Sequence, residues 1–139
     1  MRALLLHTNR FESTLTEGST RPKGIQPEER RATKEYMENC LTVLVCMEKN
    51  DSLDQVKALY EEIQKSANDI KVCNILIVPF VHLSHNVASP PQAKELSDTL
   101  VKQLSHPPFT VASSHFGYHK SWILDIKGHR CAYKYREFV

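Results

Sequence analysis

The sequence predicts an α/β fold in which a mixed β-sheet packs against two main helices, within a single domain spanning residues 1–139. Strongly apolar segments that are too short for helices alternate with two longer segments whose apolar residues recur every three or four positions. A length of 139 residues fits one domain. The 41% hydrophobic and 24% charged content is that of an ordinary globular protein.

The apolar segments predict the first strands of the sheet. Residues 3–7 form a continuous apolar run typical of a short buried strand, and residues 11–15 predict a second strand at a sheet edge. Residues 40–48 are dense in β-branched and other apolar side chains. Residues 72–81, the most hydrophobic segment, predict a central strand. Its regular pairing should fail near Pro79, because proline has no N–H to donate.

Two amphipathic helices are predicted, and each has a start signal. Ser52 can cap the first, with Gln55 as its capping-box partner, and this helix should run to about Asn68. The second opens at Pro90-Pro91, because proline suits a first helical turn. The apolar face of the first helix comprises Leu53, Val56, Leu59, Tyr60 and Ile63, and that of the second comprises Ala93, Leu96, Leu100 and Leu104.

The C-terminal third predicts three more strands, at residues 109–113, 120–126 and 130–135, joined as a β-meander. Residues 127–129, Lys-Gly-His, supply the turn between the last two. Residues 17–31 are rich in Gly, Pro, Ser, Thr and charge, which predicts a solvated loop with room for one helical turn after Pro27.

Composition and spacing restrict the possible functions. A net charge of +2 permits an RNA partner without demanding one. No apolar run approaches the roughly 20 residues of a membrane span, and residues 1–7 are too short for a signal peptide, so we expect a cytoplasmic protein with no membrane partner. The four cysteines lack paired spacing, and the histidines lack ligand partners, so no metal site is predicted.

Four motifs occur in order along the chain: MRALLLH at 1–7, ILIVPFVHLS at 75–84, HFGYHK at 115–120 and KGH at 127–129. Together, over essentially the whole chain, they resemble the N-terminal editing domain of archaeal-type threonyl-tRNA synthetases. The resemblance implies a D-aminoacyl-tRNA deacylase-like fold and a homodimer. The chain is then either a free-standing protein or the N-terminal part of a longer synthetase, whose remainder would be a partner. The resemblance also implies that no metal or cofactor is needed.

The same resemblance implies the activity. The domain would hydrolyse L-seryl-tRNA(Thr), removing serine mischarged onto threonine tRNA, and would bind the 3′ end of that tRNA. Ester cleavage would be water-mediated and RNA-assisted, because a hydroxyl of the terminal ribose lies beside the ester. The alternatives are a D-aminoacyl-tRNA deacylase, a non-catalytic tRNA-binding appendage, and a plain dimerisation module of a larger enzyme.

Lys120 and His82 match the family's catalytic motifs. The Lys120 ammonium would hold the attacking water or stabilise negative charge on the ester carbonyl. His82 would contact the substrate or the terminal ribose. Without the resemblance, each residue has a plainer interpretation: Lys120 as a solvated strand lysine, and His82 as a histidine bonded to backbone at a strand end.

The resemblance also implies a substrate-binding set. The main chain around Met47 and Val81 should line the amino-acid pocket. Tyr118 or His119 would stack on the terminal adenine or bond the ribose, as aromatic groups do with single-stranded nucleotides. Because alternate residues of a strand face opposite sides, one of these two could instead belong to the core.

The chain departs from the family at two positions. Tyr133 stands where the family has a glutamate after KGH, and the nearest acid beyond is Glu137, which could substitute only with a shift in register. This departure puts in doubt any role that needs a carboxylate. Asn9 stands where the family commonly has aspartate, a milder change because Asn keeps the same turn geometry.

Overall fold

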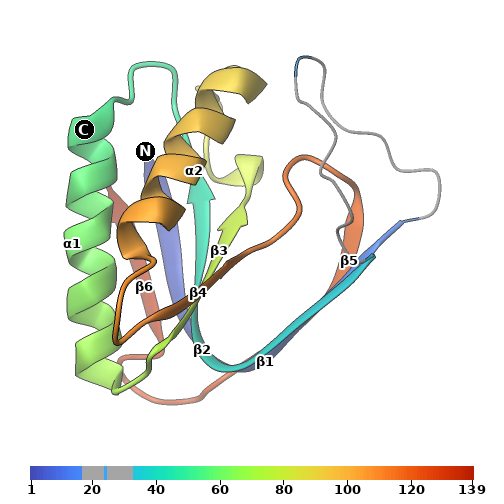
Figure 1. Ribbon diagram of the computed structural model, residues 1–139, viewed down its shortest axis with the longest axis vertical. Helices are drawn as coiled ribbons and strands as arrows, with labels where there is room; N and C mark the ends of the chain where they lie inside the picture. The colour runs from blue at the N-terminus through green and yellow to red at the C-terminus, as the bar shows by residue number, and fades with distance from the viewer. Residues whose placement is uncertain (17–23, 25–32) are drawn as a thin grey trace.

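The computed structural model describes residues 1–16, 24 and 33–139, which build one mixed sheet with two helices (Figure 1). The predicted loop at residues 17–31 lies, apart from Gly24, outside the described residues. The elements in chain order are β1 (Arg2–Leu15), β2 (Lys34–Cys46), α1 (Leu53–Ile70), β3 (Asn74–Pro79), the short 3-10 turn η1 (Val81–Leu83), α2 (Pro90–Leu104), β4 (Thr110–Ser113), β5 (Lys120–Ile126) and β6 (Tyr133–Glu137).

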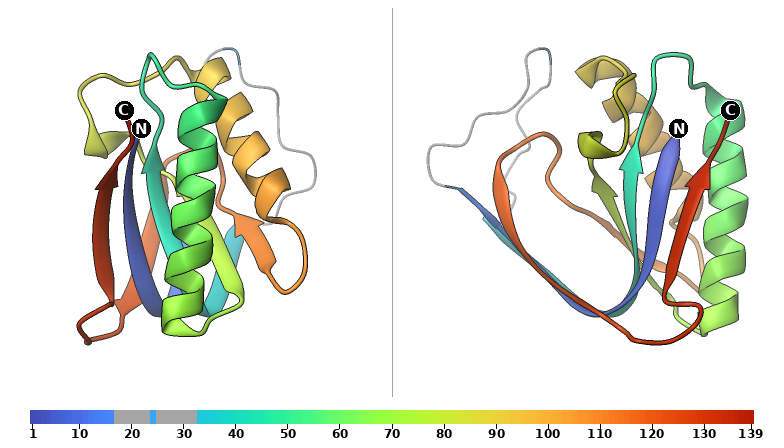
Figure 2. Two further views of the ribbon diagram at one scale, coloured as in Figure 1. Left: turned by 90° about the vertical axis from the view of Figure 1, so that its left-hand side faces the viewer. Right: turned by 180° about the vertical axis from the view of Figure 1, so that it is seen from behind.

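The sheet has the order β4-β3-β2-β1-β5, and β6 pairs with β1 off this path. Strands β2, β3 and β4 are parallel, whereas β1 is antiparallel to β2, β5 and β6. Parallel neighbours need a crossover connection, and α1 and α2 provide the two crossovers. Both helices cover the same face of the sheet (Figure 2). The predicted mixed sheet with two main helices is therefore confirmed.

The two strands predicted at residues 3–7 and 11–15 are one continuous strand of 14 residues, so the prediction of a separate edge strand is wrong. One side of β1 pairs with β2, and the other side pairs first with β6 and then with β5. Polar Asn9 and Arg10 interrupt the apolar pattern because the β1–β5 register shifts between Thr8 and Arg10. Across from this point, Asn39 of β2 has a positive φ of 43°, which asparagine tolerates well.

The predicted β-meander is also wrong, although its three strands exist. β4 pairs with β3, while β5 and β6 both pair with β1 at the other side of the sheet and not with β4. Local strand patterns could not show this, because β1 is long enough to pair with two strands in succession along one side. β6 begins at Tyr133, three residues later than predicted, because residues 127–132 form the connection.

β2 begins at Lys34, earlier than the predicted residue 40, because its first half alternates between exposed and half-buried positions and lacks a continuous apolar run. The second half is buried throughout. β3 is shorter than the predicted strand at 72–81: it ends at Pro79, opposite Val45, where the sequence predicts that regular pairing fails.

The helices pack on the sheet through one apolar core, and their caps confirm the predicted starts. Ser52 and Gln55 form a reciprocal capping box at α1, and Ser89 caps α2 with Pro90 in its first turn. Among the described residues, no helix is long and apolar enough to cross a membrane. The helix residues buried in this core include Val56, Leu59, Ile63 and Ala67 of α1, and Ala93, Leu96, Leu100 and Leu104 of α2.

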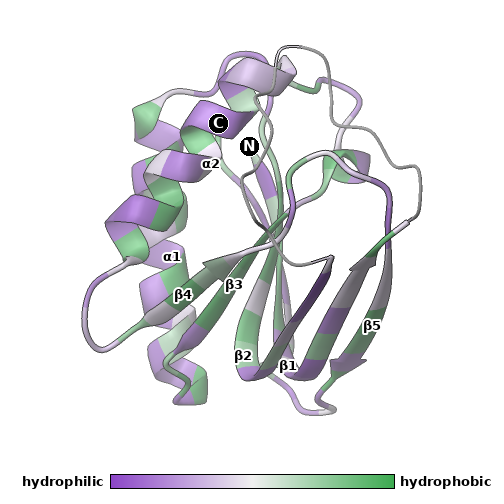
Figure 3. Ribbon diagram, turned by 45° about the vertical axis from the view of Figure 1, so that its right-hand side comes forward, coloured by the Kyte–Doolittle hydropathy of each residue, from purple (hydrophilic) through white to green (hydrophobic). Residues whose placement is uncertain are grey.

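A second apolar cluster covers the other face of the sheet, where β1 and β2 curve away from the helices toward β5 (Figure 3). Phe11 is fully buried there, and Trp122 of β5 packs against it with ring centroids 5.9 Å apart. The ring centroid of Phe80, which follows β3, lies 5.4 Å from that of Trp122. This cluster therefore joins the end of β3 to the start of β5.

Two histidines meet where the β5–β6 connection passes the middle of β1. His7 is buried, and its Nδ1 lies 2.7 Å from Nε2 of His129. The Cys131 main-chain N–H donates to the other ring nitrogen of His129, at 3.2 Å. Burial, followed by the charges of His129 and Lys127, lowers the pKa of His7 below its ordinary value of 6.5.

The His7 environment predicts that stability falls in mild acid. The unfolded chain binds a proton at His7 near pH 6.5, whereas the folded chain resists that proton to lower pH. The contribution of His7 to the free energy of unfolding is therefore at its maximum above pH 6.5 and decreases as pH falls below that value. Urea unfolding at about pH 7.5 and about pH 5.5 measures the difference. His7→Gln should reduce this slope, and His85→Gln, at an exposed histidine, should keep it. An equal slope in both variants would contradict the assignment to His7.

Candidate functional site

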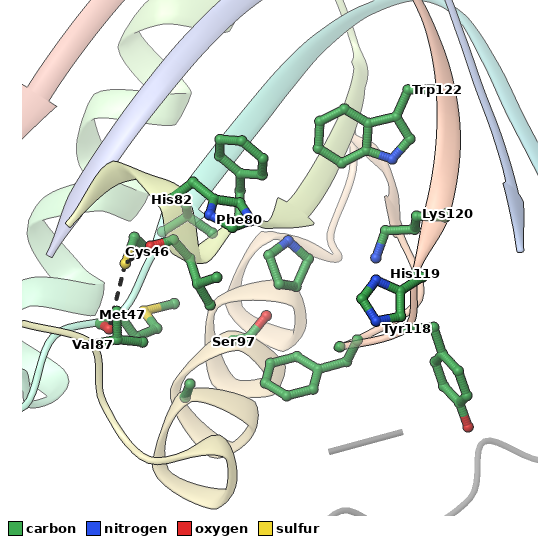
Figure 4. Close-up of a pocket in the computed structure, with 16 residues that line it drawn as sticks. Cys46, Met47, Phe80, His82, Val87, Ser97, Tyr118, His119, Lys120 and Trp122 are labelled. Atoms are coloured by element: carbon green, nitrogen blue, oxygen red, sulfur yellow. Dashed lines mark hydrogen bonds between the residues drawn. The ribbon is translucent and has the colours of Figure 1, made fainter. Parts of the chain in front are cut away.

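A cavity of about 480 Å³ opens at the carboxyl ends of β2 and β3 (Figure 4). Parallel strands end at the same edge of a sheet, and ligands in α/β folds commonly bind at that edge. The residues that line it are Val45, Cys46, Met47, Pro79, Phe80, Val81, His82, Val87, Ala93, Ser97, Phe116, Gly117, Tyr118, His119, Lys120 and Trp122.

Main-chain contacts fix the wall of the cavity that β2 and β3 provide. The Phe80 N–H donates to the carbonyl of Val45 at 2.8 Å, which completes the last parallel pair, Val45 opposite Pro79. The Cys46 thiol donates to the carbonyl of Val81 at 3.6 Å. The chain then turns away as η1, so Val81 and His82 stand at the rim while Met47 stays buried.

His82 lies on the aromatic ring of Phe80, in an edge-on arrangement with centroids 5.1 Å apart. Phe80 in turn contacts Trp122, so an aromatic series runs across the cavity from η1 to β5. The His82 imidazole is solvent-exposed and can contact a ligand without any displacement of the core.

Lys120 supplies a cation at the opposite wall. Its Nζ donates to the carbonyl of His115, at the start of the loop that leads into β5. Glu35 of β2 binds the start of that loop. Its Oε1 accepts a hydrogen bond from the His115 main-chain N–H at 2.9 Å and lies 2.5 Å from the His115 Nδ1. His115 is almost fully buried, so the Lys120 ammonium is held by a fixed part of the structure.

Tyr118 and His119 differ in direction, although both line the cavity. In Figure 4 the His119 ring lies beside Lys120, whereas the Tyr118 ring points away from both and its hydroxyl lies farthest out. Tyr118 instead has its ring 6.2 Å from that of buried His115. Of the two, His119 has the better position to meet a ligand next to the Lys120 ammonium.

The structure thus brings together every residue that the sequence predicted for the site: Met47, Val81, His82, Tyr118, His119 and Lys120. Their roles stay predictions. The sequence analysis did not predict Phe80, Ser97 and Trp122 as lining residues, although the sequence pattern around Trp122 and Ser97 indicates their positions. Trp122 is two residues from Lys120 and therefore shares its face of the strand. Ser97 is a buried polar residue four positions after Ala93 in the apolar stripe of α2.

The lining is mostly apolar, its permanent charge is the Lys120 ammonium, and it contains no acid. None of the lining residues is Asp or Glu, while Lys120, His82 and His119 all carry or can carry positive charge. Burial, followed by the charge of Glu48, raises the pKa of the Cys46 thiol, which leaves it protonated and a poor nucleophile. Within the described part of the chain, no group of three or more His, Cys, Asp or Glu side chains could hold a metal ion.

Tyr133 and Glu137, the two positions considered for the family's acid, do not line the cavity. Tyr133 is 56% exposed on β6, opposite Leu6 of β1. Glu137 lies at the end of the same strand, where it accepts from the Tyr135 hydroxyl at 2.8 Å. Neither side chain can therefore act as a base in this cavity from its place in this chain.

Comparison with known proteins identifies relatives across the whole chain. Residues 1–138 match the family described as the archaea-specific editing domain of threonyl-tRNA synthetase. The threonine–tRNA ligase of Methanococcus vannielii is 36% identical over 132 residues, which cover 93% of this chain and 20% of that protein. The ligase of Nanoarchaeum equitans is 34% identical over 135 residues, which cover 95% and 21%. The chain thus spans about a fifth of the length of these relatives, and the predicted resemblance is confirmed.

A solved structure has the same fold. The c-Myc DNA unwinding element binding protein superposes with a TM-score of 0.72 at 16% identity, covering 100% of this chain and 99% of that chain. At this identity the likeness concerns the fold alone. It confirms the predicted class, a mixed α/β sheet packed with two main helices.

Proposed function

Because the chain belongs to the archaea-specific editing domains of threonyl-tRNA synthetase, we propose that it hydrolyses L-seryl-tRNA(Thr) in the cavity at the ends of β2 and β3. The observation that carries the proposal is the convergence of Lys120 and His82, from opposite walls, on one cavity bounded by the main chain of Met47 and Val81. The Lys120 ammonium, in a lining without acids, also suits the 3′ end of a tRNA, whose phosphates are negative.

The reason for such an activity is the small difference between the two amino acids. Serine lacks one methyl group of threonine, and a binding pocket gains only about 1–3 kcal/mol from such a group. A synthetic site therefore cannot exclude serine strongly. A second site can discriminate in the opposite sense, because a rigid wall that accepts a hydroxymethyl group clashes with the added methyl of threonine. The buried, hydrogen-bonded main chain of β2 and β3 has the rigidity that such a wall needs.

The reaction that we propose is ester hydrolysis by water. Water attacks the ester carbonyl, and the Lys120 ammonium stabilises the negative charge that develops on the carbonyl oxygen. The ribose oxygen leaves and takes up the proton that the water loses, which releases serine and a tRNA with both terminal hydroxyls. His82 holds the ribose. Because the lining has no carboxylate to act as a base, the neighbouring ribose hydroxyl orients the water.

The partners follow from the same proposal. They are the 3′ end of seryl-tRNA(Thr), the remainder of a threonyl-tRNA synthetase, and a second copy of this chain, all in the cytoplasm. The exposed aromatic residues Tyr133 and Tyr135 of β6, 56% and 45% exposed, support a homodimer, since large exposed apolar groups mark interaction surfaces. Analytical ultracentrifugation of the domain should give twice the chain mass, and a species of one chain mass at micromolar concentration would refute the dimer.

We expect the domain to release serine from L-seryl-tRNA(Thr) at least about a hundredfold faster than threonine from threonyl-tRNA(Thr), since the added methyl must clash with the main chain. Deacylation assays with amino-acid-labelled substrates measure both rates. D-seryl-tRNA(Thr) in the same assay tests the competing activity, and faster release of D-serine would favour a D-aminoacyl-tRNA deacylase. Binding of both tRNAs without release of either amino acid would indicate a non-catalytic appendage, and no binding at all would leave a dimerisation module.

Lys120→Met should abolish deacylation of L-seryl-tRNA(Thr) and leave the fold intact, because it removes the ammonium while keeping a long side chain. A loss of about a hundredfold or more corresponds to removal of one oxyanion-stabilising donor. Single-turnover deacylation measures the rate, and circular dichroism verifies the fold. Lys57→Met, at an exposed lysine of α1 away from the cavity, is the matched control and should retain full activity. Near-normal turnover of the Lys120 variant would exclude Lys120 from the mechanism.

A further inference from the structure

A buried charge cluster lies behind the cavity wall that carries His82. The Met1 ammonium is almost fully buried and lies 2.7 Å from Glu48 Oε2 and 2.7 Å from Asp51 Oδ1. It also donates to the carbonyl of Phe138 at 3.0 Å. A buried ammonium needs charged partners, because leaving it unpaired costs several kcal/mol. Glu48 is therefore held in one orientation by a charge that cannot move into solvent.

The second oxygen of Glu48 faces the cavity wall. Glu48 Oε1 accepts a hydrogen bond from the Ser84 hydroxyl and lies 3.1 Å from the Nε of Arg2. Burial tends to raise the pKa of Glu48, but hydrogen bonds from Met1 and Ser84, together with nearby positive charge, hold it below its ordinary value. The side chain is thus a carboxylate at neutral pH, and a hydrogen bond to a charged group is stronger than one between neutral groups.

Ser84 directly follows the 3-10 turn η1 as its C-cap residue. That turn has only three residues, Val81–Leu83, and no side chain caps its first residue. Its entry is fixed by the main-chain bond from Phe80 to Val45, and its exit by the Ser84 hydroxyl, which also accepts from the Asn86 N–H at 3.0 Å. His82 is exposed at the middle of this turn, so its position depends on these two attachments, on the Cys46 thiol bonded to the Val81 carbonyl and on its contact with the Phe80 ring.

We propose that Glu48 and Ser84 are positioning residues, which transmit the fixed orientation of the buried Met1 ammonium to η1 and so hold His82 at the cavity. The effect of this pair on the deacylation rate rests on the proposed function. The attachment of η1 through Ser84 and Glu48 does not, because it is present in the protein without substrate. The pair touches no substrate and acts through His82.

Ser84→Ala tests the attachment, because it removes one hydroxyl and leaves the Glu48–Met1 ion pair in place. Backbone order parameters of residues 81–83, measured by ¹⁵N relaxation, should fall from about 0.85 toward about 0.6. Ser84→Thr keeps the hydroxyl and should restore the order. Ser105→Ala is the matched control, since it also removes one hydroxyl hydrogen bond, to the carbonyl of Val101, at the end of α2. Unchanged order in the Ser84→Ala turn would overturn the proposal.

The rate provides a second, independent test. Ser84→Ala should slow single-turnover deacylation of L-seryl-tRNA(Thr) roughly tenfold to a hundredfold, a loss typical of a misplaced site residue, and Ser84→Thr should recover it. In a His82→Ala background the same Ser84→Ala change should have little further effect, because a residue that acts through His82 has nothing left to position. An equal loss in both backgrounds would refute action through His82. A wild-type domain that releases no serine would refute the proposed function, while the order parameters still decide the attachment.

Discussion

The parallel pairing of β2, β3 and β4 is the constraint on which the rest of the structure depends. Parallel strands cannot be joined by tight turns, so each needs a helical crossover, and both helices bury their apolar faces on one side of the sheet. The same pairing brings the carboxyl ends of β2 and β3 to one edge. At that edge Pro79 ends the regular ladder, and the chain must leave the sheet as η1. The cavity is therefore a direct result of strand order, and the curved outer half of the sheet supplies its opposite wall through β5.

The charge distribution at this edge separates two kinds of groups. The cavity lining holds Lys120 and histidines without any acid, whereas the acids Glu35 and Glu48 lie just behind it, each engaged with a fixed partner. In these places the acids bind the segments that carry Lys120 and His82 without adding negative charge to the cavity lining. Under the proposed function, such a site would stabilise an oxyanion without a strong general base, which would leave the transfer of protons to the substrate. The tyrosine at position 133, remote from the lining, agrees with chemistry that needs no carboxylate from that strand.

Much of this arrangement could be predicted from the residues, and the failures have a common physical cause. Helix caps and apolar stripes are local, so Ser52, Gln55 and Pro90 marked the helices correctly. Strand partners are not local: nothing in residues 110–135 shows that β4 joins β3 while β5 and β6 join β1. The residues predicted for the site came from the motifs. Trp122 was not predicted, because an indole in a strand is typical of the hydrophobic core. The Glu48–Ser84 attachment joins residues far apart in sequence, and only the folded chain brings them together.

The long first strand has a consequence for biosynthesis. Arg2 lies opposite Glu137, and Leu6 opposite Tyr133, so one side of the first strand is completed only by nearly the last residues of the domain. Pairings of such high contact order form slowly, since loop-closure entropy opposes them. On the ribosome, the nascent chain must therefore keep an apolar, half-paired strand until residue 137 has left the exit tunnel. During this interval its open backbone edge is available to other chains, and premature release or slow elongation would favour aggregation over folding.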